Sequence, residues 1–325
     1  MSGYGMNGHI MMQTQGAFGA TTVTSLEAIN FVSESLVHGI EDLTEANMHG
    51  RIAASPHHQG GHSVSGGISA EAEPATMGHF LRSVMGTVDT TSGTGTQTHV
   101  FESANCGSEF SSQAANAPLT MYVYRPTVSG ATVNSAFVYY DMLANDMTIN
   151  IANGQLVTMD TNFVGAGFTR VAKTTPTFPT GKPFLWDQFS GSFNTKAITD
   201  LQDMTVSINN NLEASWTLTV SKAPDRIKRT GQQTINITGN MVFAAHSYMQ
   251  AFEAGSELPL KLNFANAASP HELLIEIDKF RLSSFDPVMG GPGLISASFA
   301  GEAMYSADSA TAVTITLVNT QATYD

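Results

Sequence analysis

The stretch DMTVSINNNLEASWTLTV, residues 203–220, indicates the fold class of this chain. Every even position in it is apolar except Asn210, and every odd position is polar. A period of two is the pattern of a β-strand with one buried and one wet face, whereas a helix would spread its apolar residues round its circumference. The run Asn209–Asn211 predicts a bend or hairpin, because asparagine tolerates left-handed backbone.

The composition also favours a mainly β chain. Of the 325 residues, 42% are hydrophobic, which is enough for a sizeable core, and only 13% are charged. Thr, Ser, Asn and Gly are frequent instead, as strand and turn surfaces prefer. The formal net charge of −13 argues against holding nucleic acid by its phosphates, which requires clustered Lys and Arg. The same charge suits a surface that must not adhere to nucleic acid.

Other segments carry helix-like or strand-like patterns. Helices are predicted at 75–85, between Pro74 and a capping Gly86, and at 247–254, before Gly255. The apolar spacing over residues 26–43 also allows a helix, although it leaves no clean face. Strands are predicted at 64–68, 119–124, 136–141, 147–151, 156–168, 235–243, 258–264, 273–282, 294–304 and 313–318.

The remaining segments are predicted to lack regular structure. Residues 1–24, rich in Gly, Met, Gln and Thr, predict an N-terminal arm that becomes ordered only against a neighbour. Pro and Gly predict a loop at 53–62, and a polar stretch predicts a long loop at 87–117. The proline-bearing segment 173–182 predicts a linker.

The second half of the chain carries the same order of patterns as the first. In each half a glycine-bearing strand precedes a short helix that ends in glycine, and paired strands follow. The repeat closes on Asn162-Phe163-Val164-Gly165 in the first half and on Ser298-Phe299-Ala300-Gly301 in the second. We therefore predict two tandem β domains, 25–172 and 183–325, with the loop 87–117 inserted in the first. The alternative is that two β-rich stretches align by chance.

No segment carries a complete catalytic, metal-binding or phosphate-binding motif, so neither an enzyme nor a cofactor is predicted. Gly61-His62-Ser63-Val64-Ser65 lacks the second glycine of a nucleophile elbow. The histidines of loop 57–62 could ligate a metal or could be ordinary exposed side chains, and the sequence leaves this open. The residues concerned are His57, His58 and His62, with Glu71 and Glu73 as further candidates.

One basic cluster stands out, formed by Arg226, Lys228 and Arg229. It could bind phosphate, but in so acidic a chain a solvated loop or a contact with an acidic surface of a neighbouring subunit is the more usual role. Trp186 and Trp216 are expected in the core. The single Cys106 allows no internal disulfide, which suits a reducing compartment. No signal peptide and no membrane-spanning run is predicted.

Taken together, the chain resembles the major tail tube protein of long-tailed, siphovirus-like bacteriophages. The resemblance is carried by the order of several segments: VSGGISAEAEPATMGHFLRSVMG at 64–86, His99-Val100-Phe101, VSINNNLE at 206–213, RTGQQTINITGNMVFAAHSYMQAF at 229–252 and VTITLVN at 313–319. It implies a tail-tube-type β-sandwich or barrel with short flanking helices. A departure is the length of the chain, which exceeds that of single-domain members and requires insertions or duplication.

The resemblance also implies a function. Such subunits form stacked rings around a channel, which is a conduit for double-stranded DNA ejection and contains the tape measure protein. Two domains per chain would give a trimeric, pseudo-sixfold ring, with a hexameric ring as the alternative. The protein would belong to the virion tail, assemble in the host cytoplasm and enclose DNA in its lumen without specific binding. Other readings are a tail terminator, an adaptor, a capsid decoration protein or a carbohydrate-binding β-sandwich.

Overall fold

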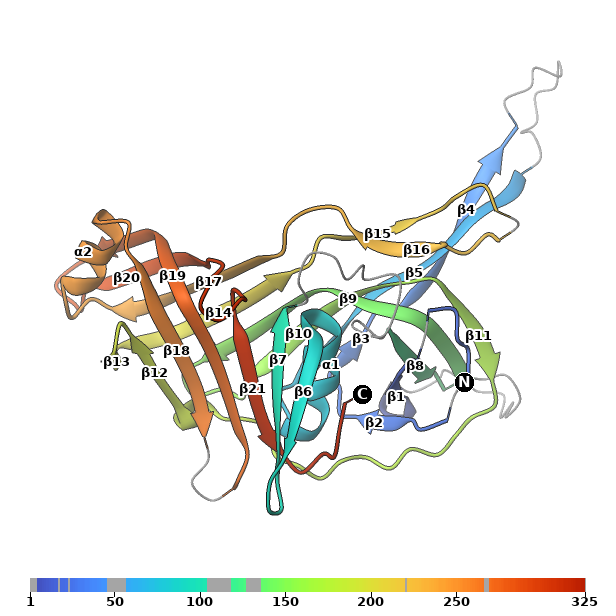
Figure 1. The fold of residues 1–325 in the computed structure, drawn as a ribbon, viewed down its shortest axis with the longest axis horizontal. Coiled ribbons are helices and arrows are strands. Elements are labelled where there is room, and N and C mark those ends of the chain that lie inside the picture. The colour runs from blue at the N-terminus through green and yellow to red at the C-terminus, as the bar shows by residue number, and fades with distance from the viewer. Residues whose placement is uncertain are drawn as a thin grey trace.

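The computed structural model describes residues 5–16, 18–22, 24–45, 57–103, 118–126, 136–219, 221–265 and 269–324. The molecule is elongated and built almost entirely of antiparallel strands, with two α-helices on the apolar side of its sheets (Figure 1). The fold is therefore mainly β, with short flanking helices, as the sequence predicted.

Two sets of elements follow one another along the chain. The first β unit consists of η1 (Gly5–Asn7), β1 (His9–Thr14), β2 (Glu27–Ile29), β3 (Ser33–Glu34), β4 (Val37–Thr44), β5 (His57–Glu71), α1 (Pro74–Met85), β6 (Gly86–Ser92), β7 (Gln97–Ser103), β8 (Leu119–Tyr124), β9 (Ala136–Ala152), β10 (Thr158–Gly165) and β11 (Gly167–Val171). The second β unit consists of η2 (Trp186–Gln188), β12 (Phe189–Phe193), β13 (Lys196–Ile198), β14 (Leu201–Asn209), β15 (Leu212–Ser215), β16 (Arg226–Arg229), β17 (Thr234–Val242), α2 (Ser247–Glu253), β18 (Glu257–Ala265), β19 (Glu272–Val288), β20 (Ser296–Ala303) and β21 (Thr314–Asn319). Between the two units, residues 172–184 form neither helix nor strand.

Each unit contains one long strand that takes part in two layers. In the first unit, the early part of β9 pairs with β8 and β11, and its later part pairs with β10, which in turn pairs with β5. In the second unit, the early part of β19 pairs with β18 and β21, and its later part pairs with β20, which pairs with β17. The outer partners also correspond, because β1 and β2 extend β8 as β12 and β13 extend β18. The same pairing scheme therefore occurs twice.

The two units share a sheet and a core. The later part of β9 pairs with β14, in a register that sets Asp146 opposite Asn209 and Ala152 opposite Asp203. A second connection pairs β21 with β7. A single cluster of buried apolar side chains, which includes Phe80, Ile149 and Ile208, runs through both units. Each large apolar side chain that is fully buried in it contributes about 1.5–3 kcal/mol relative to exposure.

The alternation that predicted a strand at 203–220 holds in its first half. Met204, Val206 and Ile208 are buried, and the residues between them are half-buried. The chain then bends at Asn211, whose φ is 51°, and β15 pairs only with β16. Leu212 is still buried there, against Leu143 and Ile227, but the cover ends beyond it, and Trp216 is 46% exposed. The expectation that Trp216 and Trp186 are core residues is wrong, since Trp186 is 45% exposed.

Both predicted helices are present. Pro74 begins α1, and Gly86, with a φ of 95°, ends it by donating its N–H to the carbonyl of Arg82. Almost every side chain of α1 is buried between the layers, whereas no residue of α2 is fully buried. Gly255, with a φ of 59°, follows α2 as expected.

Three segments differ from the sequence-based expectation. Residues 26–43 form strands and not a helix, because β2 pairs with β1 and β4 pairs with β5. The segment expected to be a loop at 53–62 enters β5 at His57, and its residues 53–56 lie outside the described part. The expected loop 87–117 begins as the hairpin of β6 and β7, while residues 104–117 lie outside the described part. In all three segments, pairing with the strand adjacent along the chain decided the structure over local composition.

Part of the expected N-terminal arm lies within the first unit. β1 pairs along its whole length with β8 and on its other side with β2, and its residues 9–13 are buried. A strand covered on both faces has no alternation to reveal it. The following segment is held by Asp141, whose Oδ1 accepts hydrogen bonds from Gln15 Nε2 at 2.5 Å and from the Gly19 N–H at 2.7 Å.

We expect Asp141→Asn to stabilise the chain by roughly 1 kcal/mol at neutral pH. Asp141 is 1% exposed and has a φ of 58°, and burial raises the pKa of its carboxyl, with the two hydrogen bonds opposing the rise. Asparagine keeps the single accepting oxygen, tolerates the left-handed backbone and carries no charge.

The pH dependence follows from the sign of this shift. A raised pKa means that the folded state retains the proton to higher pH, so the wild-type protein loses stability as pH rises from the unfolded to the folded pKa. The advantage of the asparagine variant should therefore widen over that range and then stay constant. Urea unfolding at several pH values measures it, and a wild-type protein that gains on the variant with rising pH would contradict the prediction.

Candidate conduit and assembly surfaces

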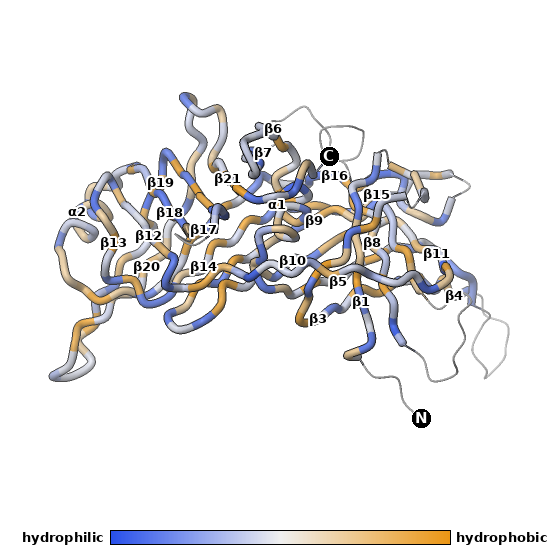
Figure 2. The backbone as a smooth tube through the Cα atoms, turned by 90° about the horizontal axis from the view of Figure 1, so that it is seen from below, coloured by the Kyte–Doolittle hydropathy of each residue, from blue (hydrophilic) through white to orange (hydrophobic). Residues whose placement is uncertain are grey.

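The polar side of the large sheet forms one continuous face across both units. It is built from β5, β10, β9, β14, β17 and β20 in that spatial order, because each strand pairs with the next. Along these strands apolar and polar residues alternate (Figure 2). We call the polar side the acidic face; its members, none of which is buried, include Ser65, Ser69, Asp146, Thr148, Asn150, Asp160, Asn162, Asp203, Thr205, Ser207, Asn236, Thr238, Asn240, Ser298 and Glu302.

Carboxylates on the acidic face are held by amides and not by cations. Asn162 Nδ2 donates to Asp146 Oδ1 at 2.7 Å, and Asn150 Nδ2 donates to Asp160 Oδ2 at 3.0 Å. Across the next pair of strands, Asn240 Nδ2 donates to both carboxylate oxygens of Asp203, at 2.9 and 3.0 Å. These bonds fix the side chains while leaving their negative charge uncompensated.

The strand segments of the acidic face lack the two permanently cationic residue types. No lysine or arginine occurs in 57–71, 143–152, 158–165, 203–209, 234–242 or 296–303. The phosphates of a nucleic acid near this face would meet carboxylates and amides. No lysine or arginine is present there to neutralise the phosphates and release their counterions. The face can therefore lie beside nucleic acid without holding it.

Two strands leave an open edge at opposite ends of the molecule (Figure 1). Within the described residues, β4 pairs only with β5, and the last part of β19, after Arg281, pairs only with β20. Both edges carry exposed apolar side chains, which are Val37, Ile40 and Leu43 on β4 and Val288 and Met289 at the end of β19. Unpaired strand edges of this kind are templates for pairing with another chain.

The basic cluster predicted from the sequence lies on β16 and does not act as one group. Arg226 and Lys228 are exposed, opposite Ser215 and Glu213 of β15. Arg229 points inward, where its Nη2 donates to Asn210 Oδ1 at 3.1 Å. The structure therefore gives Arg229 an internal role, and a subunit contact through Arg226 and Lys228 stays a prediction.

The histidines of interest lie on the β4–β5 hairpin. His58 Nε2 is 2.9 Å from Glu45 Oε1, and His57 Nδ1 is 3.2 Å from Thr44 Oγ1. His62 lies against His38, with ring centroids 5.1 Å apart. In the described residues, no group of three or more His, Cys, Asp or Glu side chains is placed to hold a metal ion. Ser63 lies inside β5, so the segment around it does not form the sharp strand-to-helix turn of a nucleophile elbow.

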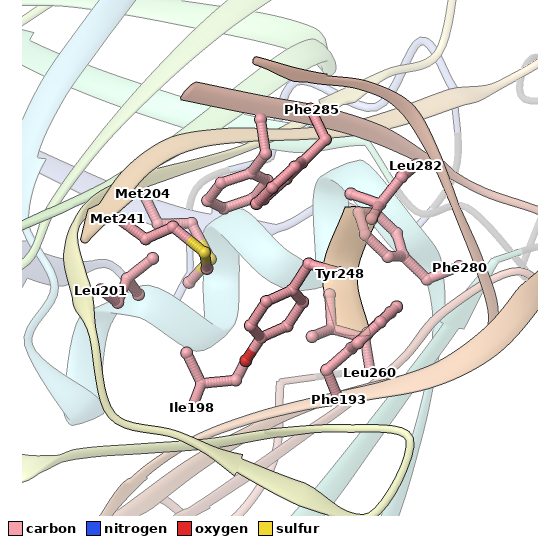
Figure 3. A pocket seen from close by; sticks show the side chains of 11 residues that line it. Phe193, Ile198, Leu201, Met204, Met241, Tyr248, Leu260, Phe280, Leu282 and Phe285 are labelled. Carbon is pink, nitrogen blue, oxygen red and sulfur yellow. The ribbon is translucent and has the colours of Figure 1, made fainter. Parts of the chain in front are cut away.

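An apolar pocket lies between α2 and the layers of the second unit (Figure 3). Tyr248 of α2 points into it, and its cavity is small, about 30 Å³. It offers no charged group to a ligand, so we interpret it as a packing gap. Its lining is Phe193, Ile198, Leu201, Met204, Met241, Tyr248, Leu260, Phe280, Leu282, Phe285 and Phe299.

The acidic face was not identified from the sequence, although its signal was present. Each strand shows polar residues at alternate positions, and none of these strand segments contains a lysine or an arginine. What the sequence lacked was the pairing register, which brings Asp146, Asp160 and Asp203 from distant segments to one side of one sheet.

A comparison with protein families places the chain among known sequences. A family model described as phage tail tube protein matches residues 8–303, which covers the first β unit from β1 and the second as far as β20. No curated protein matches the sequence. Neither helix of the described part is long and apolar enough to cross a membrane.

Proposed function

The chain belongs to the phage tail tube protein family, and we propose that it assembles into stacked rings that form the tail tube of a siphovirus-like phage. The tube serves as the conduit for double-stranded DNA during ejection and encloses the tape measure protein before that. It assembles in the host cytoplasm, and its role is structural, without catalysis. The observation that carries the conduit role is the acidic face, a continuous sheet surface without cations.

The repeated pairing scheme supports a ring of three chains. Each β unit has the same long strand, the same neighbours and the same helix position, as expected for two tail-tube domains at 25–172 and 183–325 joined by 173–182. Three such chains present six similar units around one axis. A head-to-tail interface that closes on itself ends the ring without open edges. Six chains in a ring remain the alternative.

The orientation of the face follows from the same arrangement. The helices pack on the apolar side of the sheet, and among the described residues the β15–β16 hairpin covers the polar side only at its β5–β10 end, through Leu212 and Ile227, so most of the acidic face is left uncovered. A bare negative lining repels the phosphates of DNA and so lowers friction along the channel. We therefore assign the acidic face to the lumen.

Electron microscopy of purified protein tests the proposal. Rings or tubes are expected, with threefold symmetry and two similar sectors per chain, and the acidic face should line the channel in a reconstruction. A ring mass of six chains would replace the trimer by the hexamer. Single particles that never assemble would favour a carbohydrate-binding module, and isolated rings that never stack would favour a tail terminator or adaptor.

A further inference from the structure

We propose that neighbouring chains join by a copy of the joint that connects the two β units within one chain. The open edge at the end of β19 pairs antiparallel with the open edge of β4 in the next chain. This inference rests on the proposed function, because it describes how the ring closes. It specifies which two strands pair between neighbouring chains, in which direction and in which register. We call this pair of strands the seam.

The internal joint is the template for the seam. The later part of β9 pairs with β10 on one side and with β14 on the other, so β14 carries the sheet from the first unit into the second. At this joint Ile149 lies opposite Val206, and Met147 lies opposite Ile208, with all four side chains buried. Their common burial makes the joint part of the core.

The repeat defines which residues take the same places at the other end. Phe163 of β10 pairs with Gly66 of β5, and Phe299 of β20 pairs with Gly239 of β17, so these strands are counterparts. The pairing then extends outward from them. Met147 lies opposite Thr161 in the first unit, and its counterpart in the second is Pro287, opposite Ala297.

The same extension identifies the counterpart of β14. In the second unit, Ile208 lies opposite Ile235 of β17, which is two residues before Ile237. In the first unit, Ile40 lies opposite His62 of β5, which is two residues before Val64. Ile237 and Val64 are themselves counterparts, because they pair with Gly301 and Gly165. β4 therefore stands in the first unit where β14 stands in the second, but no described strand pairs with its outer side.

Transferring the internal register gives the seam residue by residue. Ile40 of the next chain lies opposite Pro287, Gly39 opposite Val288, and His38 opposite Met289. Ile40, His38, Pro287 and Met289 face the core side, whereas Gly39 and Val288 continue the acidic face.

Exposure of the isolated chain supports this register. Met289 is 80% exposed and Ile40 is 45% exposed, whereas their counterparts Ile149 and Ile208 are 0% and 1% exposed. Two of the apolar side chains that the edges leave in water, Met289 and Ile40, are thus among those that the seam would bury. Pro287 lacks an N–H donor, which is typical of an edge that must avoid indiscriminate pairing.

The position of the two edges favours a ring. They lie at opposite ends of the elongated molecule, so one chain cannot satisfy its own edges (Figure 1). Head-to-tail pairing alternates internal joints with seams, and three chains give a closed sheet in which each unit has the same two neighbours. The acidic face then runs without interruption round the lumen.

Engineered disulfides test the register directly. In a Cys106→Ser background, the pair Gly39→Cys and Val288→Cys should crosslink in rings, because directly opposed residues of antiparallel strands lie within disulfide reach. A Cβ at Gly39 has room, with its nearest neighbour, the Ser63 oxygens, at 3.8 Å. A non-reducing gel should then show a ladder that ends at three chains.

Two matched pairs control this experiment. Ser207→Cys with Thr148→Cys occupies the counterpart positions of the internal joint and should crosslink within one chain, without a ladder. Gly39→Cys with Ser284→Cys is displaced by roughly 13 Å along the strand and should not crosslink. Rings in which Gly39→Cys and Val288→Cys stay unlinked, or in which the displaced pair links instead, would overturn the seam.

A charge on the edge provides a second test. Ile40→Asp should lower ring formation at least tenfold, measured by mass photometry, while circular dichroism of the free chain is unchanged because Ile40 is exposed. Leu218→Asp is the matched control, since Leu218 is equally apolar and fully exposed but lies outside the seam. Equal assembly of the Ile40 variant and wild type would overturn the seam.

The register also predicts a variant that assembles better. It sets Glu41 of the next chain opposite Asp286, where the internal joint has Asn209 opposite Asp146. Like charges directly opposite disfavour pairing, so Asp286→Asn should tighten association by about two- to fivefold. An unchanged or weaker association would count against this register.

These outcomes separate the seam from the proposed function. Failure of the wild-type chain to form rings overturns both. Rings without the predicted crosslink overturn the seam alone. A crosslinked ladder that continues to six chains supports the seam and replaces the trimer by the hexamer.

Discussion

Replacing Asn210 by aspartate is expected to destabilise the folded chain by roughly 3–5 kcal/mol, although only one side-chain atom changes its identity. Asn210 is 0% exposed, at the end of β14 where the two units meet. Its Nδ2 donates to the carbonyl of Val84 at 2.7 Å and to that of Ala144 at 3.1 Å. These carbonyls belong to the end of α1 and to β9, so one amide connects the helix, the first unit and the second.

The other side of the same amide is also satisfied. Asn210 Oδ1 accepts from Arg229 Nη2 at 3.1 Å and from Gln233 Nε2 at 2.9 Å. All four hydrogen-bonding positions of the side chain are therefore used. Aspartate keeps the accepting oxygen but turns the donating nitrogen into a second oxygen, which then faces two buried carbonyls that have lost their donors. Buried polar groups left without partners carry their full desolvation cost.

Urea unfolding followed by circular dichroism measures this effect. Asn194→Asp is the matched control, because Asn194 is exposed in a turn with a φ of 47°, which aspartate also tolerates. We expect the control to stay within about 0.5 kcal/mol of wild type. Similar midpoints for both variants would show that the Asn210 network contributes little.

Asn210 also shows how far the sequence determined this fold. The alternation at 203–220 predicted a strand correctly as far as Ile208, because β14 has a neighbour on each side and a core beneath it. Beyond the bend the same alternation continues through Trp216 and Leu218, which are exposed. An alternation of apolar and polar residues shows that the two faces of a strand differ. It does not show whether another layer of the protein covers the apolar face.

The reverse error occurred at β1. His9, Ile10, Met11 and Met12 are all buried, on both faces of the strand, so no alternation marked the segment and its composition resembled a disordered arm. The acidic face needed a third kind of information. Its carboxylates come from β9, β10, β14 and β20, and only the register of the sheet places them together. Local patterns do not contain such long-range pairing.

Loss of the Tyr324 side chain is expected to cost about 3–5 kcal/mol, the usual range for a large buried aromatic residue. Tyr324 is 1% exposed, with its ring 4.9 Å from that of His79 and 4.7 Å from that of His99. Its hydroxyl donates to the carbonyl of Ala75 at 2.9 Å and accepts from Asn319 Nδ2 at 2.6 Å. The side chain thus fastens the end of the chain to the first turn of α1, and burial raises the pKa of its hydroxyl.

Tyr324→Phe separates the ring from the hydroxyl. It keeps the packing, and Asn319 Nδ2 retains the carbonyl of Pro74 at 2.7 Å, so a loss of only about 1 kcal/mol is expected. Thermal unfolding of Tyr324→Ala and Tyr324→Phe measures both effects. A phenylalanine variant as unstable as the alanine variant would place the stabilisation in the hydroxyl and not in the ring.

A double-mutant cycle with Gly78 tests the ring contact more sharply. Gly78 lies within α1, and the three atoms nearest to a Cβ added there all belong to the Tyr324 ring and would overlap it. Gly78→Ala alone should therefore destabilise the chain by about 1–3 kcal/mol, through overpacking. In the Tyr324→Ala background the obstacle is gone, and alanine exceeds glycine in helix propensity by about 1 kcal/mol. The same substitution should then become stabilising, and a destabilisation that persists without the ring would show that Gly78 is required for another reason.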